Sequence, residues 1–195
     1  MFFFGKQKLV AIGASTGGVN AIKAIFSSFP AFIPPVVLVI HMQENITKIF
    51  ANDLNDACQF EVKVAETGDV VKPNQVLIAP GGRHMKVLNR TGELYVECFH
   101  GEKVHFVIPS ADVLFDSVAQ ACGQNAVGVI LTGIGADGAS GLLKMKQAGA
   151  ETIGQNEETS VVYGMPMAAM EMGAVNHELP LDEIAGKILE LGGRP

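Results

Sequence analysis

Short apolar runs recur along the chain, and most of them end at a glycine, a proline or a polar residue. Runs of aliphatic and β-branched residues without a regular polar alternation are typical of strands buried on both faces, as in a parallel sheet. The runs that predict strands are residues 9–13, 36–40, 60–64, 75–79 and 126–131, with a short strand near Thr152.

Between these runs, apolar residues return every three or four positions, which is the spacing of one face of a helix. Val19, Ile22 and Phe26 have this spacing, and Pro30 closes their segment. Helices are predicted at residues 17–28, 45–57, 138–148, 166–172 and 182–191, and one more begins after Ser110, a residue type suited to capping.

Residues 85–88 and 93–99 flank the turn sequence Asn-Arg-Thr-Gly, which predicts a β-hairpin. Elsewhere, strands alternate with helices. This order predicts an α/β fold with a doubly wound, mostly parallel sheet, helices on both faces, and an antiparallel β-hairpin in addition.

The composition fits a single domain spanning residues 1–195, because 48% of the residues are hydrophobic and only 17% are charged. The 14 basic and 20 acidic residues give a formal net charge of −6. This balance argues against nucleic acid or an anionic membrane surface as the main partner. The longest apolar run, residues 29–40, contains three prolines and is too short to cross a bilayer, so we expect no membrane insertion.

The three cysteines, Cys58, Cys98 and Cys122, are odd in number and form no CxxC pattern. They predict neither a disulfide framework nor a zinc site, and a reducing, cytoplasmic setting is the simplest expectation. Residues 1–8 lack the long apolar stretch of a signal peptide.

Polar residues suited to catalysis follow three of the predicted strands. Ser15 follows the first strand, His41 follows the second, and Asp137 lies in the loop after the strand at 126–131. The carboxyl ends of parallel strands meet at one edge of a sheet, where α/β proteins bind their ligands. The three residues therefore predict a serine nucleophile, with His41 as its base and Asp137 as the acid that orients the base.

The residues around Ser15 support this hypothesis. Ser15 lies in a G-x-S-x-G pattern at 13–17, whose glycines allow a sharp strand-to-helix turn that exposes the hydroxyl. The helix that follows would direct free backbone N–H groups toward the site. The chain order Ser, His, Asp differs from the Ser, Asp, His order of the α/β-hydrolases, so the pattern does not indicate that fold.

Each candidate also has a simpler interpretation. A glycine-rich loop after the first strand often binds nucleotide phosphates, but neither G-x-G-x-x-G nor GK[ST] occurs here. His41 alone is typical of a hydrogen-bonded histidine at a strand end, and Asp137 alone of an N-cap for the helix that follows it. His84 suits either a substrate-facing or a turn-stabilising role. His100 and His105 lack a metal-ligand spacing, so no metal site is expected.

Several longer motifs occur in one order along the chain. They are AIGASTGG at 11–18, HM at 41–42, IAPGG at 78–82 with HM at 84–85, PSADVLF at 109–115, VGVILTGIGADG at 127–138 and TSVVYGMP at 159–166. With these motifs the chain resembles the catalytic domain of the chemotaxis protein-glutamate methylesterase family, CheB, from about residue 9 to residue 191.

The resemblance implies that the same three residues form a catalytic triad on a doubly wound sheet. It implies the removal of methyl groups from glutamyl methyl esters on chemoreceptor cytoplasmic helices, and deamidation of certain receptor glutamines, without a metal or a cofactor. Methylated chemoreceptor cytoplasmic domains are thus the implied partners. Backbone N–H groups near Thr16 and Gly17, or in the Ile134 loop, are expected to stabilise the oxyanion.

Two departures from the family pattern concern partners. Relatives usually carry a basic segment before the Pro-Ser pair, whereas residues 105–108 are His-Phe-Val-Ile. This change predicts weaker docking to acidic receptor helices, or another protein ester as substrate. Relatives also usually have an N-terminal receiver domain. Because the first strand begins at residue 9, we expect no receiver domain in this chain, which is then either an excised domain or a protein that stands alone. A receiver domain or regulator absent from this chain is the expected controlling partner.

Two other functions remain open at this point. One is a serine esterase that acts on another protein or on a small ester. The other is a non-catalytic signalling module that keeps the same fold.

Overall fold

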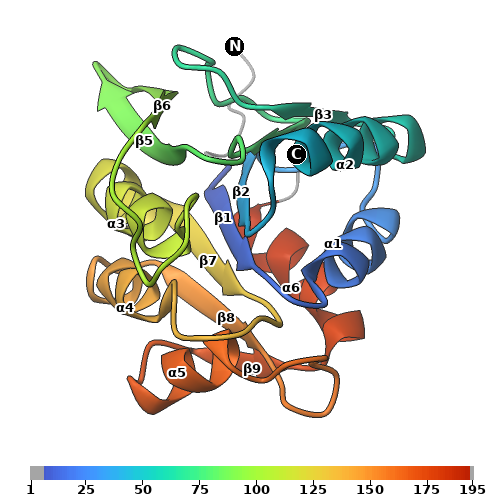
Figure 1. Cartoon of the computed structure of the whole chain (residues 1–195), viewed down its shortest axis with the longest axis vertical. Coiled ribbons are helices and arrows are strands. Elements are labelled where there is room, and N and C mark those ends of the chain that lie inside the picture. The colour runs from blue at the N-terminus through green and yellow to red at the C-terminus, as the bar shows by residue number, and fades with distance from the viewer. Residues whose placement is uncertain (1–6, 194–195) are drawn as a thin grey trace.

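The computed structural model describes residues 7–193, so residues 1–6 and 194–195, which include part of the segment tested for a signal peptide, lie outside the described residues. Its main feature is a seven-stranded parallel sheet in the order β3-β4-β2-β1-β7-β8-β9 (Figure 1). The strands are β1 (Leu9–Ala14), β2 (Val36–Ile40), β3 (Glu61–Val64), β4 (Gln75–Ile78), β7 (Ala126–Ile130), β8 (Glu151–Gln155) and β9 (His177–Leu179).

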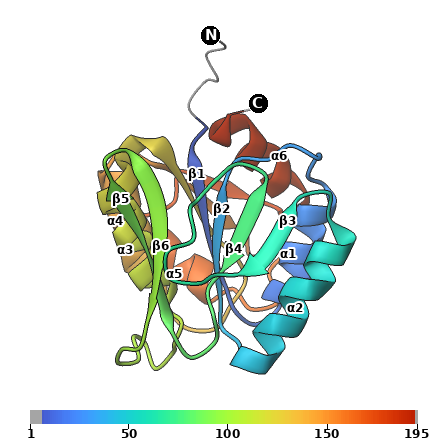
Figure 2. The same ribbon diagram turned by 90° about the horizontal axis from the view of Figure 1, so that it is seen from above.

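Helices cover both faces of this sheet (Figures 1 and 2). One face carries α1 (Gly18–Ser27), α2 (Glu44–Ala57) and α6 (Leu181–Gly192). The other carries α3 (Ala111–Cys122), the short 3-10 turn η1 (Gly123–Asn125), α4 (Ala139–Gln147) and α5 (Met165–Glu171). The predicted doubly wound α/β fold is therefore confirmed. Within residues 7–193, none of the helices has the length and apolar character that a bilayer crossing requires.

The central strands are buried on both faces because alternate residues pack into two separate cores. In β1, Val10 and Ile12 pack with α1, α2 and α6, whereas Leu9 and Ala11 pack with α3 and α4. Successive side chains of a strand point to opposite faces, so a strand between two helical layers needs apolar residues at every position. This explains the unbroken apolar runs that predicted the strands.

The predicted β-hairpin is also confirmed, but it forms its own two-stranded sheet. It consists of β5 (His84–Arg90) and β6 (Glu93–Phe99), which lie beside α3 in Figure 2. The Val87 N–H donates to the buried Ser117 hydroxyl of α3 at 2.9 Å, which ties the hairpin to this helix. The three-residue strand β9 was not predicted.

The order of the strands places the topological switch at β1. The chain leaves β1 for β2 on one side and later returns to β7 on the other side. In register, Ala14 is opposite Ile40 and Gly13 is opposite Ile130. The carboxyl ends of β1, β2 and β7 therefore meet at the centre of one edge, where doubly wound proteins bind their ligands.

Candidate active site

Ser15 is the first residue after β1, and the pairing of β1 with β2 sets it beside His41. The His41 N–H donates to the Ala14 carbonyl at 3.1 Å, and the Ser15 N–H donates to the Thr132 carbonyl at 3.0 Å. The chain then turns sharply at Gly17, which has φ +83°. A Cβ atom at Gly17 would lie only 2.7 Å from the Cβ of Val161. Glycine is thus required there for both conformation and space.

His41 and Asp137 form a close pair at this edge. His41 Nε2 lies 2.7 Å from Asp137 Oδ2, with 11% of the histidine side chain and 2% of the aspartate side chain exposed. Since Nε2 contacts the carboxylate, Nδ1 is the ring nitrogen that remains free to accept a proton. The described residues contain no hydrogen bond between the Ser15 hydroxyl and His41, a gap common in catalytic sites without substrate.

The Asp137 carboxylate accepts hydrogen bonds at both oxygens. Oδ2 accepts from His41 and from the Ala111 N–H at 2.7 Å, and Oδ1 accepts from the Ser110 hydroxyl at 2.6 Å and the Asp112 N–H at 3.1 Å. Burial would raise the pKa of Asp137, but hydrogen bonds from His41, Ser110 and the two N–H groups outweigh it and lower the pKa. The acid therefore stays ionised.

This arrangement corrects the simpler interpretation of Asp137. Its carboxylate does not cap α4, the helix that follows it, whose N-cap is Gly138 with no side-chain cap bond. It instead accepts from the first N–H groups of α3, which begins 26 residues earlier at Ala111. The N-terminus of a helix favours a negative charge, so α3 helps to hold the aspartate ionised.

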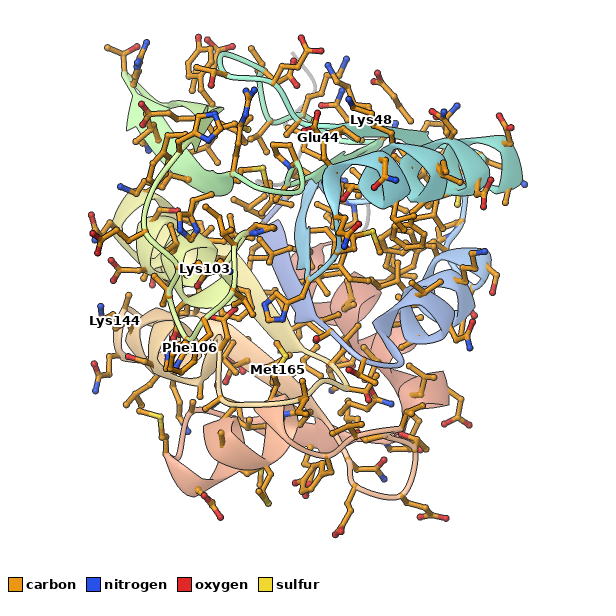
Figure 3. The ribbon with its side chains drawn as sticks, viewed as in Figure 1. Glu44, Lys48, Lys103, Phe106, Lys144 and Met165 are labelled. Carbon is orange, nitrogen blue, oxygen red and sulfur yellow. The ribbon has the colours of Figure 1, made fainter. Side chains whose placement is uncertain are left out.

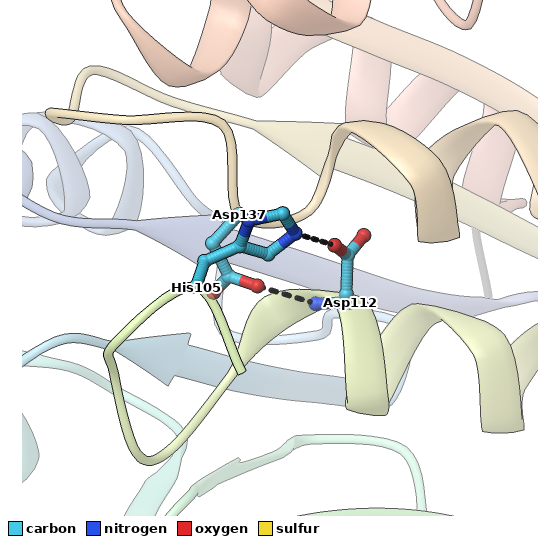
Figure 4. A group of neighbouring side chains, drawn as sticks. All are labelled: His105, Asp112 and Asp137. Carbon is cyan, nitrogen blue, oxygen red and sulfur yellow. Dashed lines mark hydrogen bonds and ion pairs between the residues drawn. The ribbon is translucent and has the colours of Figure 1, made fainter. Parts of the chain in front are cut away.

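A second histidine–aspartate pair lies beside the first (Figure 4). His105 Nε2 lies 2.9 Å from Asp112 Oδ2, while Asp112 Oδ1 accepts from the Gly141 N–H at 2.6 Å. Ligand atoms of His105, Asp112 and Asp137 lie within 4.8 Å of one another, as in a metal site, and His100 is not part of this group. However, a carboxylate has about four lone-pair positions, and four donors already occupy those of Asp137. The chemistry of this cluster therefore does not fit a metal ion.

The residues whose backbone N–H groups are proposed for the oxyanion, Thr16, Gly17 and Ile134, are exposed or half-exposed. Within residues 7–193, the N–H groups of Thr16, Gly17 and Ile134 donate to no carbonyl or side chain. The Gly133 N–H is not available, because it donates to the Val162 carbonyl at 3.0 Å. Three backbone donors near the serine are thus available to a ligand.

Sequence reasoning missed two residues that shape the loops around Ser15. Thr132 donates its hydroxyl to the Thr16 carbonyl at 3.0 Å and accepts from the Val162 N–H at 3.0 Å, so it joins two loops of the site. Gly133 passes so close to Ser15 that a Cβ atom there would lie 2.7 Å from the Cβ of Ser15. They lie two and three residues after the end of β7, and that position is the signal that could have identified them.

His84 and Ser110 hold the loop that leads to α3. The Ser110 N–H donates to His84 Nδ1 at 3.2 Å, and His84 Nε2 lies 2.8 Å from the Glu102 carbonyl. The two contacts require a neutral imidazole with its proton on Nε2, since Nδ1 accepts. His84 is only 2% exposed, so the substrate-facing interpretation is wrong and the turn-stabilising one is confirmed.

A cleft of about 450 Å³ opens beside His41. Its walls come from the start of α2, the loop before β5 and the loop before α3. The residues that line it are His41, Met42, Gln43, Glu44, Gly81, Gly82, Lys103, Phe106, Val107 and Ile108. The candidate base therefore faces a space large enough for a side chain carrying an ester.

Comparisons with known proteins agree with this geometry. The family model described as CheB methylesterase matches residues 10–188. A protein of Bdellovibrio bacteriovorus named "Protein-glutamate methylesterase/protein-glutamine glutaminase" is 51% identical over 184 residues, which are 94% of this chain and 52% of that protein. A similarly named protein of Syntrophomonas wolfei is 52% identical over 94% of this chain and 54% of its own length. The chain spans about half the length of these curated relatives.

A solved structure gives the same result for the fold. The Thermotoga maritima CheB methylesterase catalytic domain superposes with a TM-score of 0.92 at 37% identity, and the match covers 95% of this chain and 98% of that domain. The chain therefore belongs to the CheB methylesterase family.

Proposed function

We propose that this protein hydrolyses glutamyl methyl esters in protein substrates, with Ser15 as nucleophile, His41 as base and Asp137 as orienting acid. One observation carries the proposal. The end of the strand beside Ser15 holds a histidine 2.7 Å from a buried carboxylate that four donors keep ionised. The names of the relatives, protein-glutamate methylesterase and protein-glutamine glutaminase, indicate the substrate class.

In the first half of the reaction, Ser15 Oγ attacks the ester carbonyl and its proton passes to Nδ1 of His41. Asp137, bound at Nε2, stabilises the imidazolium that forms. The N–H groups near Thr16 and Gly17, or that of Ile134, stabilise the oxyanion, and one such donor is worth about 3–4 kcal/mol. When the tetrahedral intermediate collapses, the methoxy oxygen takes the proton from His41 and methanol leaves.

In the second half, water attacks the acyl-enzyme while His41 again accepts a proton. The bond to Ser15 Oγ breaks, the proton returns to the serine, and a glutamate side chain is released. The same steps on a glutamine would release ammonia instead of methanol. Methylated chemoreceptor cytoplasmic domains are the proposed substrates, and a receiver domain or separate regulator is the proposed controlling partner.

The test is methanol release from a methylated chemoreceptor cytoplasmic domain by this protein and by its Ser15→Ala variant. The Ser15 hydroxyl donates no hydrogen bond within the described residues, so the variant should fold as the parent does, and its melting temperature checks this. We expect release by the parent and none above background by the variant. Equal release by both would exclude Ser15 as the nucleophile.

A small ester, the γ-methyl ester of N-acetylglutamic acid amide, separates the two alternative functions. Rapid turnover of this ester without release from the protein substrate would indicate an esterase with another substrate. Binding of the methylated protein without turnover of either compound would indicate a non-catalytic signalling module.

A further inference from the structure

The three most exposed large apolar side chains of residues 7–193 all belong to loops around the candidate active site. Phe106 is 93% exposed, Val161 is 69% exposed and Ile134 is 68% exposed. We call these three residues the apolar collar. Exposed apolar side chains that gather around a site mark a surface that a partner covers.

Each member of the collar contacts or adjoins a part of the site. Phe106 lines the cleft together with His41. Ile134 lies three residues before Asp137 in the same loop. Val161 lies over the turn after Ser15, since a Cβ atom at Gly17 would meet its side chain at 2.7 Å. A protein substrate whose ester enters the cleft would therefore meet these side chains.

The backbone holds Phe106 outward in a conformation that a bulky residue rarely adopts. Val104 and Val107 exchange two backbone hydrogen bonds, of 3.1 and 3.0 Å, around a two-residue turn. The turn residues His105 and Phe106 have φ +51° and +64°, where Asn-Gly is the favoured pair. The stability of the turn therefore does not explain why a phenylalanine occupies position 106. Backbone strain of this kind is frequent at binding sites.

The cleft is less acidic than the chain as a whole, which carries a net charge of −6. Lys103 lines the cleft, and Glu44 is the one acidic residue among the lining side chains. Glu44 is already paired with Lys48 at 2.8 Å. The hydrogen bond and charge of Lys48 lower the pKa of Glu44, and the positive charges of Arg83 and His100 lower it further. Figure 3 shows Lys103 and Phe106 on one loop, with Glu44 and Lys48 at the start of α2.

We propose that the apolar collar, with the basic rim of Lys48, Arg83 and Lys103, docks an acidic segment of a protein substrate, the segment that carries the methyl ester. This inference rests on the proposed function and deepens it. A segment rich in glutamates is anionic wherever they are unmethylated, so it complements the rim. The rim also supplies basic groups that residues 105–108 lack, from three segments far apart in sequence. A small ester has no neighbouring residues that could contact the collar, so the two kinds of substrate separate docking from chemistry.

The test compares kcat/KM for a methylated chemoreceptor cytoplasmic domain with kcat/KM for the γ-methyl ester of N-acetylglutamic acid amide. We expect Phe106→Ala to lower the ratio of the two values at least tenfold, mainly through KM for the protein substrate. Phe32→Ala is the matched control, since Phe32 is also exposed, at 61%, and does not line the cleft. It should leave the ratio unchanged.

A second variant, Phe106→Gly, shows whether the effect of Phe106→Ala arises from misfolding. Glycine favours the positive φ at this position, so its melting temperature should equal or exceed that of the parent while the ratio still falls. A ratio within twofold of the parent for both Phe106 variants would overturn the role of the collar.

The rim is tested by charge reversal. Lys103→Glu should lower the ratio severalfold, and the loss should shrink as salt is added, because screening weakens the charge contrast. Lys187→Glu on α6 is the matched control and should change neither value. An unchanged ratio for Lys103→Glu at low salt would contradict charge-based docking. Absence of methanol release by the parent protein would instead refute the proposed function itself.

Discussion

Two histidine–aspartate pairs lie side by side at one edge of the sheet, with almost the same contact distance. His41 and Asp137 are 2.7 Å apart, and His105 and Asp112 are 2.9 Å apart. The histidines differ in exposure: the side chain of His41 is 11% exposed and that of His105 is 46% exposed. Only His41 lies at the strand end next to Ser15.

The two carboxylates differ more than their histidines do. Burial raises the pKa of Asp112, and the Gly141 N–H and His105 offset only part of this effect. Burial acts on Asp137 in the same direction, but His41, Ser110 and the N-terminus of α3 reverse it and lower the pKa. The comparison teaches that two histidine–aspartate contacts of similar length can leave their acids with opposite pKa shifts. The donors around each acid decide the direction in which its pKa moves.

The largest expected effect comes from removing the charge of one acid at a time. Asp137→Asn should reduce kcat about 10³–10⁴-fold, because the amide neither stabilises the imidazolium nor fixes the reactive ring nitrogen. The matched change Asp112→Asn keeps an acceptor for the Gly141 N–H and should reduce kcat less than tenfold. Steady-state methanol release measures both, and similar losses in the two variants would contradict the contrast between the pairs.

An intermediate effect is expected from Ser110→Ala, which removes one donor from Asp137. The pKa of Asp137 is lower in the folded state than its ordinary value of 3.8. The charge of Asp137 therefore stabilises the fold at pH values above 3.8, and this stability is lost as the pH falls through the folded-state pKa. The variant should therefore lose about 1.5–3 kcal/mol of unfolding free energy at pH 7. The difference from the parent should narrow on acidification.

The control for this experiment is Ser117→Ala in α3, the helix that Ser110 caps. Ser117 accepts from the Val87 N–H and donates to the Leu114 carbonyl, without contact to Asp137. Its loss should lower stability by a similar amount that does not vary with pH. Urea unfolding at several pH values measures both variants, and a pH-independent loss for Ser110→Ala would refute its role in holding the charge.

The smallest effect is expected from His105→Gln. This pair is half-exposed, and such pairs contribute about 0–1 kcal/mol to stability. We expect a stability loss below about 1 kcal/mol and a kcat/KM on the small methyl ester within about threefold of the parent, whereas His41→Gln should abolish turnover. A large loss of turnover for His105→Gln would place the second pair in the mechanism.

Much of the fold could be predicted because two buried faces demand apolar residues throughout a strand. The central strands accordingly begin and end within one residue of the predicted bounds, as in β1 and β7. The short strand β9 could not be predicted, because His177–Leu179 is half-exposed and contains no apolar run. Its strand character arises from pairing with β8, which is a tertiary effect.

The residues of the candidate site were predictable to the extent that position along a strand determines position in space. Ser15 and His41 directly follow adjacent strands, so the topology alone brings them together. The contacts of Ser110 with Asp137, and of His84 with Ser110, join residues 26 or 27 positions apart. A local sequence pattern does not predict such contacts. The hydrogen bonds that Asp137 accepts from the first N–H groups of α3 were missed for the same reason.

The double use of Asp137 has a consequence for how activity is lost during evolution. Under the proposed function, a gene copy that loses Asp137 loses a helix cap together with the chemistry, so the fold itself comes under selection. A copy that loses the Ser15 hydroxyl gives up no hydrogen bond within residues 7–193. Inactive descendants that still dock substrate should therefore arise first by change at Ser15, while Asp137 persists as a relic of the ancestral enzyme.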